Sequence, residues 1–274
     1  AMEDVFRGIW VVAYRELLRF VEERTRMLSS FAQPLLFLII FGAGFSRIIG
    51  TMTPGVNFIQ FMYPGIIAMT VLMSSIMSGV SIVWDREFGF LREILIAPLG
   101  RSGIVLGKAT GSAGVAVVQG IVMLVLAPLL GISLNPLMVT KLILILIVIS
   151  MSLAGLGVLI ASRMRSQQGF MIIIQIIVMP LVFLSGVFFP VNNVPAWLAV
   201  ISKINPLTYG VDAIRQLFLG KEIAAIGGVM GQGSYALGVT VLGHTMTILE
   251  DMLVVLVCGI VLLSIAIWSF SRQE

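Results

Sequence analysis

Six apolar stretches divide the sequence, each about 19 to 28 residues long and free of charged residues near its centre. About 20 apolar residues form a helix long enough to cross the hydrocarbon core of a bilayer. The stretches lie at about 27–46, 61–83, 103–130, 142–162, 170–189 and 252–270. Apolar residues are 59% of the 274 residues and charged residues 11%, so a water-soluble fold of this size has no interior large enough for them. We therefore expect an all-α integral membrane protein with six transmembrane helices in a single domain, 1–274.

The N-terminal segment, residues 1–26, shows a different periodicity. Apolar side chains recur at helical spacing on one face, at Phe6, Ile9, Trp10, Ala13, Leu17, Phe20 and Val21. Charged side chains follow the same spacing on another face, at Arg15, Arg19, Glu22 and Arg26. This pattern predicts an amphipathic helix in the plane of the membrane interface, with a soluble docking helix as the alternative.

Lys and Arg are unevenly distributed between the two sides that six spans define. Twelve of the 17 lie on the side that carries both termini, and five lie on the other side. Because cytoplasmic loops carry the excess of Lys and Arg, we expect a multi-pass protein of the inner (plasma) membrane with both termini in the cytoplasm. The net charge of +4 then reflects topology, and we expect no nucleic-acid partner.

The segment 190–249, which this topology places outside the cell, differs in composition from the spans. Pro190, Pro195 and Pro206 interrupt it, and glycines are frequent from Gly227 to Gly243. The pattern predicts two short helices, at 195–204 and 207–219. It leaves open whether any part of 223–249 enters the membrane.

Charged residues are absent from the centres of the spans, where ion-coupled carriers usually hold ionisable groups. Gln33, Gln119 and Gln175 are the main polar side chains there, and contacts between helices explain them more simply than substrate binding. This pattern indicates that energy is delivered from outside the spans, although an ion-coupled carrier or channel without an ATPase remains the alternative. His244 and Cys258 are single, so we predict neither a metal site nor an intrachain disulfide.

The charged segment between the second and third stretches is a candidate site for that energy to enter. It begins at Trp84 and reads W-D-R-E-F-G-F-L-R-E-I-L-I-A-P-L-G-R. Phe88, Leu91 and Leu95 share one helix face, and Pro98 would stop the helix. A short apolar helix at 85–98 with charged ends is suited to a partner's groove, but an interfacial linker helix gives the same pattern.

Two segments resemble a known family. Residues 85–108 resemble the first cytoplasmic loop of bacterial type-2 ABC (ABC-2) transporter permeases, and residues 184–215 resemble the signature region of the same family. The recurring elements are Ser185-Gly186, Phe189-Pro190, Pro195-Ala196-Trp197, Asn205-Pro206-Leu207-Thr208-Tyr209 and Asp212-Ala213-Ile214-Arg215. The resemblance covers nearly the whole chain and is greatest to the branch that exports drugs, antibiotics and lipo-oligosaccharides.

The resemblance implies the permease subunit of an ATP-driven exporter. Such a permease moves a hydrophobic or amphipathic substrate (drug, antibiotic, lipid or glycolipid) out of the cytoplasm or inner leaflet by alternating access. It would pair with a second copy of itself or a paralogous permease, contact membrane lipid, and bind two copies of an ABC ATPase subunit. The chain lacks the motif G-x-x-x-x-G-K-[ST], so we expect no cofactor on it and no enzyme activity of its own, with ATP and Mg on the partner.

The resemblance also implies roles for particular residues. The coupling helix that docks on the ATPase would contain Asp85, Arg86, Glu87, Phe88, Gly89, Leu91, Arg92, Glu93 and Pro98. Short helices re-entering the outer leaflet would form an extracellular gate with Gly186, Pro190, Pro195, Trp197, Asn205, Pro206, Tyr209, Asp212 and Arg215. The second and fifth spans would line a substrate cavity with Met69, Thr70, Met73, Met77, Gln175, Met179 and Phe183. Methionine walls suit varied apolar cargo, although a methionine stripe also arises from simple packing.

Overall fold

In the computed structural model, six helical segments within the described residues are long and apolar enough to cross a membrane, one of them formed by α3 and α4 together. The structure describes residues 2–52, 58–88, 101–230, 238–241 and 244–272. The helices are α1 (Met2–Glu22), α2 (Arg24–Met52), α3 (Phe58–Met77), α4 (Val80–Glu87), α6 (Arg101–Leu126), α7 (Pro136–Arg163), α8 (Gln167–Leu184), α9 (Ala196–Ile204), α10 (Pro206–Met230) and α11 (Ile248–Ser271). Short 3-10 turns η1 (Ala127–Leu130) and η2 (Val191–Asn193) and a two-residue strand pair, β1 (Thr240–Val241) and β2 (His244–Thr245), complete the described elements. The all-α membrane architecture with six spans is confirmed.

Helix α3 forms the centre of the bundle. Every residue from 61 to 72 is buried, because α3 is apolar on all sides and is surrounded by α2, α6, α7 and α10. Helix α7 approaches α3 closely at Gly157, where an added Cβ would lie 2.5 Å from the carbonyl oxygen of Ile76. Small residues allow this approach, which membrane helices use to gain packing contacts where the surrounding lipid offers no hydrophobic driving force.

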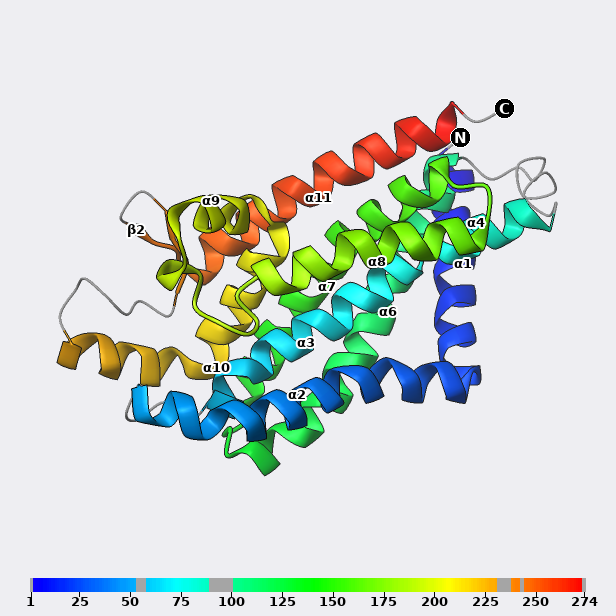
Figure 1. Ribbon diagram of the computed structural model, residues 1–274. Helices are drawn as coiled ribbons and strands as arrows, with labels where there is room; N and C mark the ends of the chain where they lie inside the picture. The colour runs from blue at the N-terminus through cyan, green and yellow to red at the C-terminus, as the bar shows by residue number, and fades with distance from the viewer. Residues whose placement is uncertain (1, 53–57, 89–100, 231–237, 242–243, 273–274) are drawn as a thin grey trace.

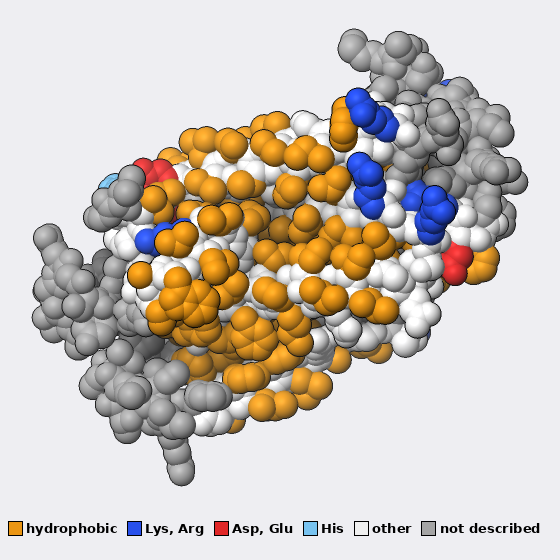
Figure 2. Space-filling model, turned by 45° about the horizontal axis from the view of Figure 1, so that its top comes forward, with side chains coloured by type: hydrophobic (Ala, Val, Ile, Leu, Met, Phe, Trp, Pro, Cys, Tyr) orange, Lys and Arg blue, Asp and Glu red, His pale blue; other side chains and the backbone are white. Residues whose placement is uncertain are grey.

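The outer surface of the bundle is an apolar belt (Figure 2). Large exposed side chains on its faces include Leu36 and Ile39 of α2, Ile176 of α8, and Leu253 and Ile260 of α11. Lys and Arg side chains gather at one end of the belt in the same view. Such extensive exposed apolar surface is typical of contact with lipid, so the surface agrees with the multi-pass reading.

The two ends of the bundle carry different elements (Figure 1). Both chain termini, α1 and α4 lie at one end, whereas α9 and β2 lie at the other. The axis of helix α1 lies at a steep angle to that of the neighbouring α2, and α1 packs against α6. Its outward side chains include Phe6, which is 74% exposed, and Trp10, which is 68% exposed. Both ends of the chain therefore share one side, and α1 offers an apolar face away from the bundle.

Several predicted helix ends were wrong. Helix α2 continues to Met52, beyond the apolar stretch that ends at about 46. Helix α7 begins at Pro136 and not at 142, since Asn135 accepts a hydrogen bond from Leu137 N–H and caps the helix. Helix α8 ends at Leu184, before the predicted 189, and α10 runs beyond 219 to Met230.

Candidate functional site

The last turn of α4 binds three different helices through three consecutive residues. Asp85 Oδ2 lies 3.6 Å from Arg15 Nη2 of α1. Arg86 Nη1 donates to the carbonyl oxygens of Ala161 and Ser162, each at 3.3 Å, and also to that of Met164. Glu87 Oε2 accepts a hydrogen bond of 3.0 Å from the backbone N–H of Gln167. We call Asp85, Arg86 and Glu87 the α4 clamp.

The charges of the clamp match the helix ends that they meet. Arg86 lies at the C-terminal end of α7, where unpaired carbonyl groups favour a cation. Glu87 lies at the first residue of α8, where free N–H groups favour an anion. The clamp therefore joins the C-terminal end of α7 and the N-terminal end of α8 to α4.

The structure differs from the prediction of a separate coupling helix at 85–98 in the first residues of that range. Asp85, Arg86 and Glu87 end α4, which follows α3 after a break at Ser78 and Gly79, and do not begin a separate helix. Phe88 follows them with 68% of its surface exposed. The remaining predicted coupling residues, Gly89, Leu91, Arg92, Glu93 and Pro98, lie outside the described residues.

A buried ion pair joins α1 to α6 beside this clamp. Lys108 Nζ lies 2.9 Å from Glu16 Oε1, and Ser81 of α4 donates to the same carboxylate oxygen at 3.0 Å. Lys108 also contacts the Ser81 hydroxyl. Burial alone would raise the pKa of Glu16, but the Lys108 ammonium and the hydrogen bonds from Lys108 and Ser81 lower it below its usual range. The pair and Ser81 therefore tie α1, α4 and α6 together.

Two glycines of α6 make this contact possible. A Cβ at Gly107 would lie 2.7 Å from Cβ of Val12, and one at Gly111 would lie 2.8 Å from Cβ of Glu16. The absence of side chains at these positions creates a shallow groove for α1. Sequence reasoning missed the ion pair, because its partners are 92 residues apart. The spacing of Gly107 and Gly111 is the typical small-residue signal of close helix packing.

Residues of the predicted extracellular gate form hydrogen bonds between elements at the opposite end of the bundle. Gly186 ends the α8 region with a φ of +80°, which glycine adopts readily, and its carbonyl oxygen accepts a hydrogen bond of 2.6 Å from Arg215 Nη2. The Arg215 guanidinium also lies 4.0 Å from the ring centroid of Phe61. Asn205 donates to the carbonyl oxygen of Leu181 at 2.7 Å, and Tyr209 donates to that of Lys203 at 2.7 Å.

The prolines of the same set start or border helices, and Trp197 stays exposed. Pro206 is the first residue of α10, where its missing N–H costs nothing. Pro195 directly precedes α9, and Pro190 directly precedes η2. The Trp197 side chain of α9 is 66% exposed. These positions explain how α9 and α10 turn back on the bundle.

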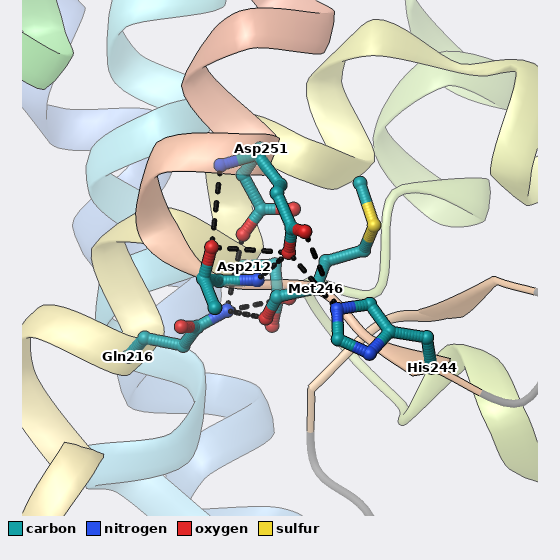
Figure 3. A network of polar contacts seen from close by, with 7 residues as sticks. Asp212, Gln216, His244, Met246 and Asp251 are labelled. Atoms are coloured by element: carbon teal, nitrogen blue, oxygen red, sulfur yellow. Dashed lines mark hydrogen bonds and ion pairs between the residues drawn. The ribbon is translucent and has the colours of Figure 1, made fainter.

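Two buried carboxyl groups meet at this end, between α10 and α11 (Figure 3). The Gln216 amide nitrogen lies 3.0 Å from Asp212 Oδ2, from Asp251 Oδ2 and from the carbonyl oxygen of Met246. Asp212 Oδ2 also accepts from Val239 N–H at 2.9 Å. Burial raises the pKa of Asp212, although the Val239 N–H and the Arg215 charge oppose this. Burial lowers the pKa of Arg215 to about 10.

The predicted cavity residues fall into three groups. Met69 and Thr70 are buried inside the bundle. Met73 and Met77 line a cavity of about 400 Å³ between α1, α2, α3, α6 and α8. Gln175, Met179 and Phe183 lie exposed on α8 and are not among the residues that line this cavity.

The predicted inter-helix role of glutamine is seen at Gln119. It accepts from Ser74 at 2.8 Å and donates to Ser30 at 3.2 Å, so it connects α6 with α3 and α2. Gln33 and Gln175 are exposed on their helices instead.

Comparison with known proteins gives a consistent result. The family model described as "ABC-2 type transporter" matches residues 7–219. A protein of Cyanophora paradoxa named as a transport permease, ycf38, is 32% identical over 77% of this chain and 73% of its own length. A protein of Escherichia coli (strain K12) named as a multidrug ABC transporter permease, YbhR, is 32% identical over 61% of this chain and 45% of its own length. Nodulation protein J of Rhizobium meliloti (strain 1021) is 27% identical over 73% of this chain and 77% of its own length.

Proposed function

This chain belongs to the ABC-2 type transporter family, and we propose that it is the membrane subunit of an exporter driven by a separate ATPase. Members of the family are permeases that work with ABC ATPase subunits. The proposal adds a direction, out of the cytoplasm, and a cargo class, hydrophobic or amphipathic molecules. It also adds an assembly of two permease chains with two ATPase subunits that carry ATP and Mg.

The α4 clamp is the observation that carries this proposal. Its three residues bind α1, α7 and α8, and the chain leaves the clamp directly into the segment 89–100 that resembles the ATPase-docking loop. A force applied to this segment reaches α4 first. Because the clamp fixes α7 and α8 to α4, the force moves three helices together and not one alone.

ATP supplies the force by favouring one arrangement of the paired ATPases. A ligand shifts a conformational equilibrium only by binding one state more tightly than the other, and here that ligand is ATP on the partner. With the clamp in the cytoplasm, the outer end closed by Arg215 and Gly186 would open only when α8 and α10 separate. The exposed side chains of α8, among them Gln175, Met179 and Phe183, would then face the second permease chain.

The test is transport by the purified permease in sealed vesicles with and without its ATPase subunit. We expect ATP-dependent movement of a fluorescent amphiphile only when both subunits and ATP are present. A proton or sodium gradient alone is expected to drive nothing. Gradient-driven transport by the permease without the ATPase would overturn the proposal and support the ion-coupled carrier.

A further inference from the structure

The side chains of Asp212 and Asp251 meet at the end of the bundle that carries α9 (Figure 3). Asp212 belongs to α10 and Asp251 to the first turn of α11, and both are almost completely buried. The Gln216 amide nitrogen lies 3.0 Å from one oxygen of each and from the Met246 carbonyl oxygen. An amide nitrogen carries two hydrogens, so it cannot donate a full hydrogen bond to all three oxygens. The site therefore holds more acceptors than donors.

The two carboxyl groups also lie within hydrogen-bonding reach of each other. Two carboxylates so close together repel strongly when both are ionised, and such pairs in other proteins share one proton. No donor among the described residues reaches Asp212 Oδ1 or Asp251 Oδ1, although both atoms are buried. A buried acceptor without a donor is costly, above all on an ionised group. A proton held between the two carboxyl groups supplies a donor and removes one of the two negative charges.

Arg215 provides one positive charge next to the pair. Its charge stabilises the ionised form of Asp212, which precedes it by about one turn of α10. The guanidinium is buried, and no acceptor among the described residues reaches its Nε. One buried cation balances one carboxylate, whereas a second carboxylate is left without a counter-charge. The electrostatics therefore favour a pair with a single negative charge.

The surroundings of the pair add one further negative charge. Glu250, beside Asp251 in α11, repels it and lies 3.3 Å from the exposed ring of His244. Tyr209 of α10 lies near Asp251 and donates its hydroxyl hydrogen to the Lys203 carbonyl oxygen at 2.7 Å. Helices α3 and α8 contain no charged residue. The other charged or titratable residues nearest this end, on α10 and on the elements packed against it, are Lys221 and Glu222 of α10, Tyr63 of α3, Lys141 of α7, Lys203 of α9 and Cys258 of α11. Among the cations that the structure describes, Arg215 is the one whose charge acts on the pair.

The carboxyl pair connects α10, α11 and the segment that carries β1 and β2. Asp212 accepts a hydrogen bond of 2.9 Å from Val239 N–H, directly before β1. Gln216 donates to the Met246 carbonyl oxygen, directly after β2. Asp251 brings α11 into the same network through Gln216. A separation of α10 from α11 therefore breaks the carboxyl pair and loosens the β1–β2 segment with it.

We propose that Asp212 and Asp251 share one proton while this end of the permease is closed, and that loss of the proton separates α10 from α11 and opens it. The proton passes from a carboxyl group to the water on the α9 side, which the proposed topology places outside the cell. After separation each carboxylate is hydrated alone, so proton release and opening favour each other. Acid therefore keeps this end closed and alkali opens it, in the direction expected from the raised pKa of Asp212. The inference goes beyond the proposed export function, because it describes how external pH controls the closure by Arg215 and Gly186.

The experiment measures the distance between α10 and α11 as a function of pH, in the permease–ATPase complex in lipid nanodiscs without nucleotide. Spin labels are placed at Gly220 of α10, where a Cβ meets nothing within 4 Å, and at Leu249 of α11, which is 80% exposed, on a Cys258→Ser background. We expect the ratio of long to short distances to rise about tenfold from acidic to alkaline buffer, as for one titrating group whose pKa differs by about one between the two states. The infrared band of a protonated carboxyl group should disappear over the same pH range. A distance that stays constant over this range, or that lengthens in acid, would overturn the proposal.

Variants of neighbouring carboxyl groups locate the response. Asp251→Asn keeps the shape of the side chain and leaves one ionisable group in the pair, so we expect the short distance at every pH. Asp212→Asn makes the same test from the other half of the pair if Asp251→Asn does not fold. The matched control is Glu250→Gln, which removes the adjacent carboxylate but keeps a residue that can complete the cap of α11. This control should respond to pH as the unchanged protein does, and so should His244→Gln, which removes the single histidine. A normal pH response of the Asp variants, or its loss in Glu250→Gln, would contradict the shared proton.

A metal cation between the two carboxylates would also hold α10 and α11 together, and a titration at constant pH separates this case. Addition of calcium or of a chelator at fixed pH should leave the distance between the labels unchanged. A distance that follows the calcium concentration would overturn the shared proton. Failure of the export function is detected separately, because the pH response needs no ATP. If the chain is not an ATPase-driven exporter, ATP-dependent transport in vesicles is absent whatever the pH response.

Discussion

Lys108 and Glu16 form an ion pair of 2.9 Å in which both side chains are almost completely buried. The pair lies where α1 crosses α6, and Ser81 of α4 completes it. Helix α1 is thus fixed to the spans by a buried ionic contact. The clamp on α4 lies next to this contact, so α1 is positioned to move with α4.

Removing one partner of this pair should destabilise the protein strongly. In Lys108→Met the Glu16 carboxylate is left buried without its cation, and breaking a buried pair typically costs about 3–5 kcal/mol. We expect a corresponding loss in the free energy of unfolding, measured by titration from mild detergent into SDS. The double variant Glu16→Gln with Lys108→Met should recover most of this loss. A double variant as unstable as Lys108→Met would show that the charge pair is not the cause.

The glycine groove of α6 should not tolerate a side chain. Gly111→Leu forces atoms into the space that Glu16 occupies, and overpacking typically costs about 1–3 kcal/mol. We expect α1 to detach, seen as faster protease cleavage between α1 and α2 in the purified protein. Gly44→Ala is the matched control, because a Cβ at Gly44 meets nothing within 4 Å. Unchanged cleavage of Gly111→Leu would contradict the packing of α1 on α6.

Arg86 is expected to be required for tight docking of α4 on α7. Arg86→Ala removes the hydrogen bonds to the last carbonyls of α7, and hydrogen bonds from a charged donor contribute about 1.5–3 kcal/mol. We expect lower thermal stability and reduced permease-dependent ATP hydrolysis by the complex. Arg86→Lys retains the charge but not the several donors of the guanidinium, so its effect should be intermediate. Full hydrolysis by Arg86→Ala would argue against transmission through this contact.

The Asp212 carboxyl should make stability depend on pH in a defined direction. Its pKa is raised in the folded protein, so the folded state holds the proton more tightly than the unfolded state does. Stability is therefore greatest below the ordinary Asp pKa and falls as the pH rises towards the folded pKa. In Asp212→Asn this part of the decrease should vanish in thermal unfolding scans from acidic to alkaline buffer. If the stability of Asp212→Asn falls with pH as steeply as that of the unchanged protein, the pH dependence arises from other groups.

The six spans were predictable from sequence because each one is a continuous apolar stretch without charged residues near its centre. Their ends were less predictable. Lys141 made the fourth span seem to start at 142, yet α7 includes Lys141, whose long stem can carry its charge to the interface. The glycines after Leu219 suggested a loop, but α10 continues to Met230.

A linear motif pointed to residues that interact in the structure, although their role as a gate stays a prediction. The signature region located Gly186 and Arg215, which the structure joins by a hydrogen bond. Partners that are far apart along the chain were not predictable, because their approach depends on how the helices pack. Glu16 with Lys108, and Asp212 with Asp251, belong to this group. The coupling role stays a prediction for every residue of the set, from Asp85 to Pro98.

The central claim is that the α4 clamp makes α4 and α8 move as one unit when ATP acts on the complex. The most direct measurement is the distance between spin labels at Phe88 and Gln168, on a Cys258→Ser background, in nucleotide-free and ATP-trapped complexes. We predict that this distance stays constant, while the distance between Phe88 labels on the two permease chains changes. Glu87→Gln weakens the hydrogen bond to α8, so the distribution of Phe88-to-Gln168 distances should become broader in this variant. A Phe88-to-Gln168 distance that changes with ATP in the unaltered clamp would contradict the account.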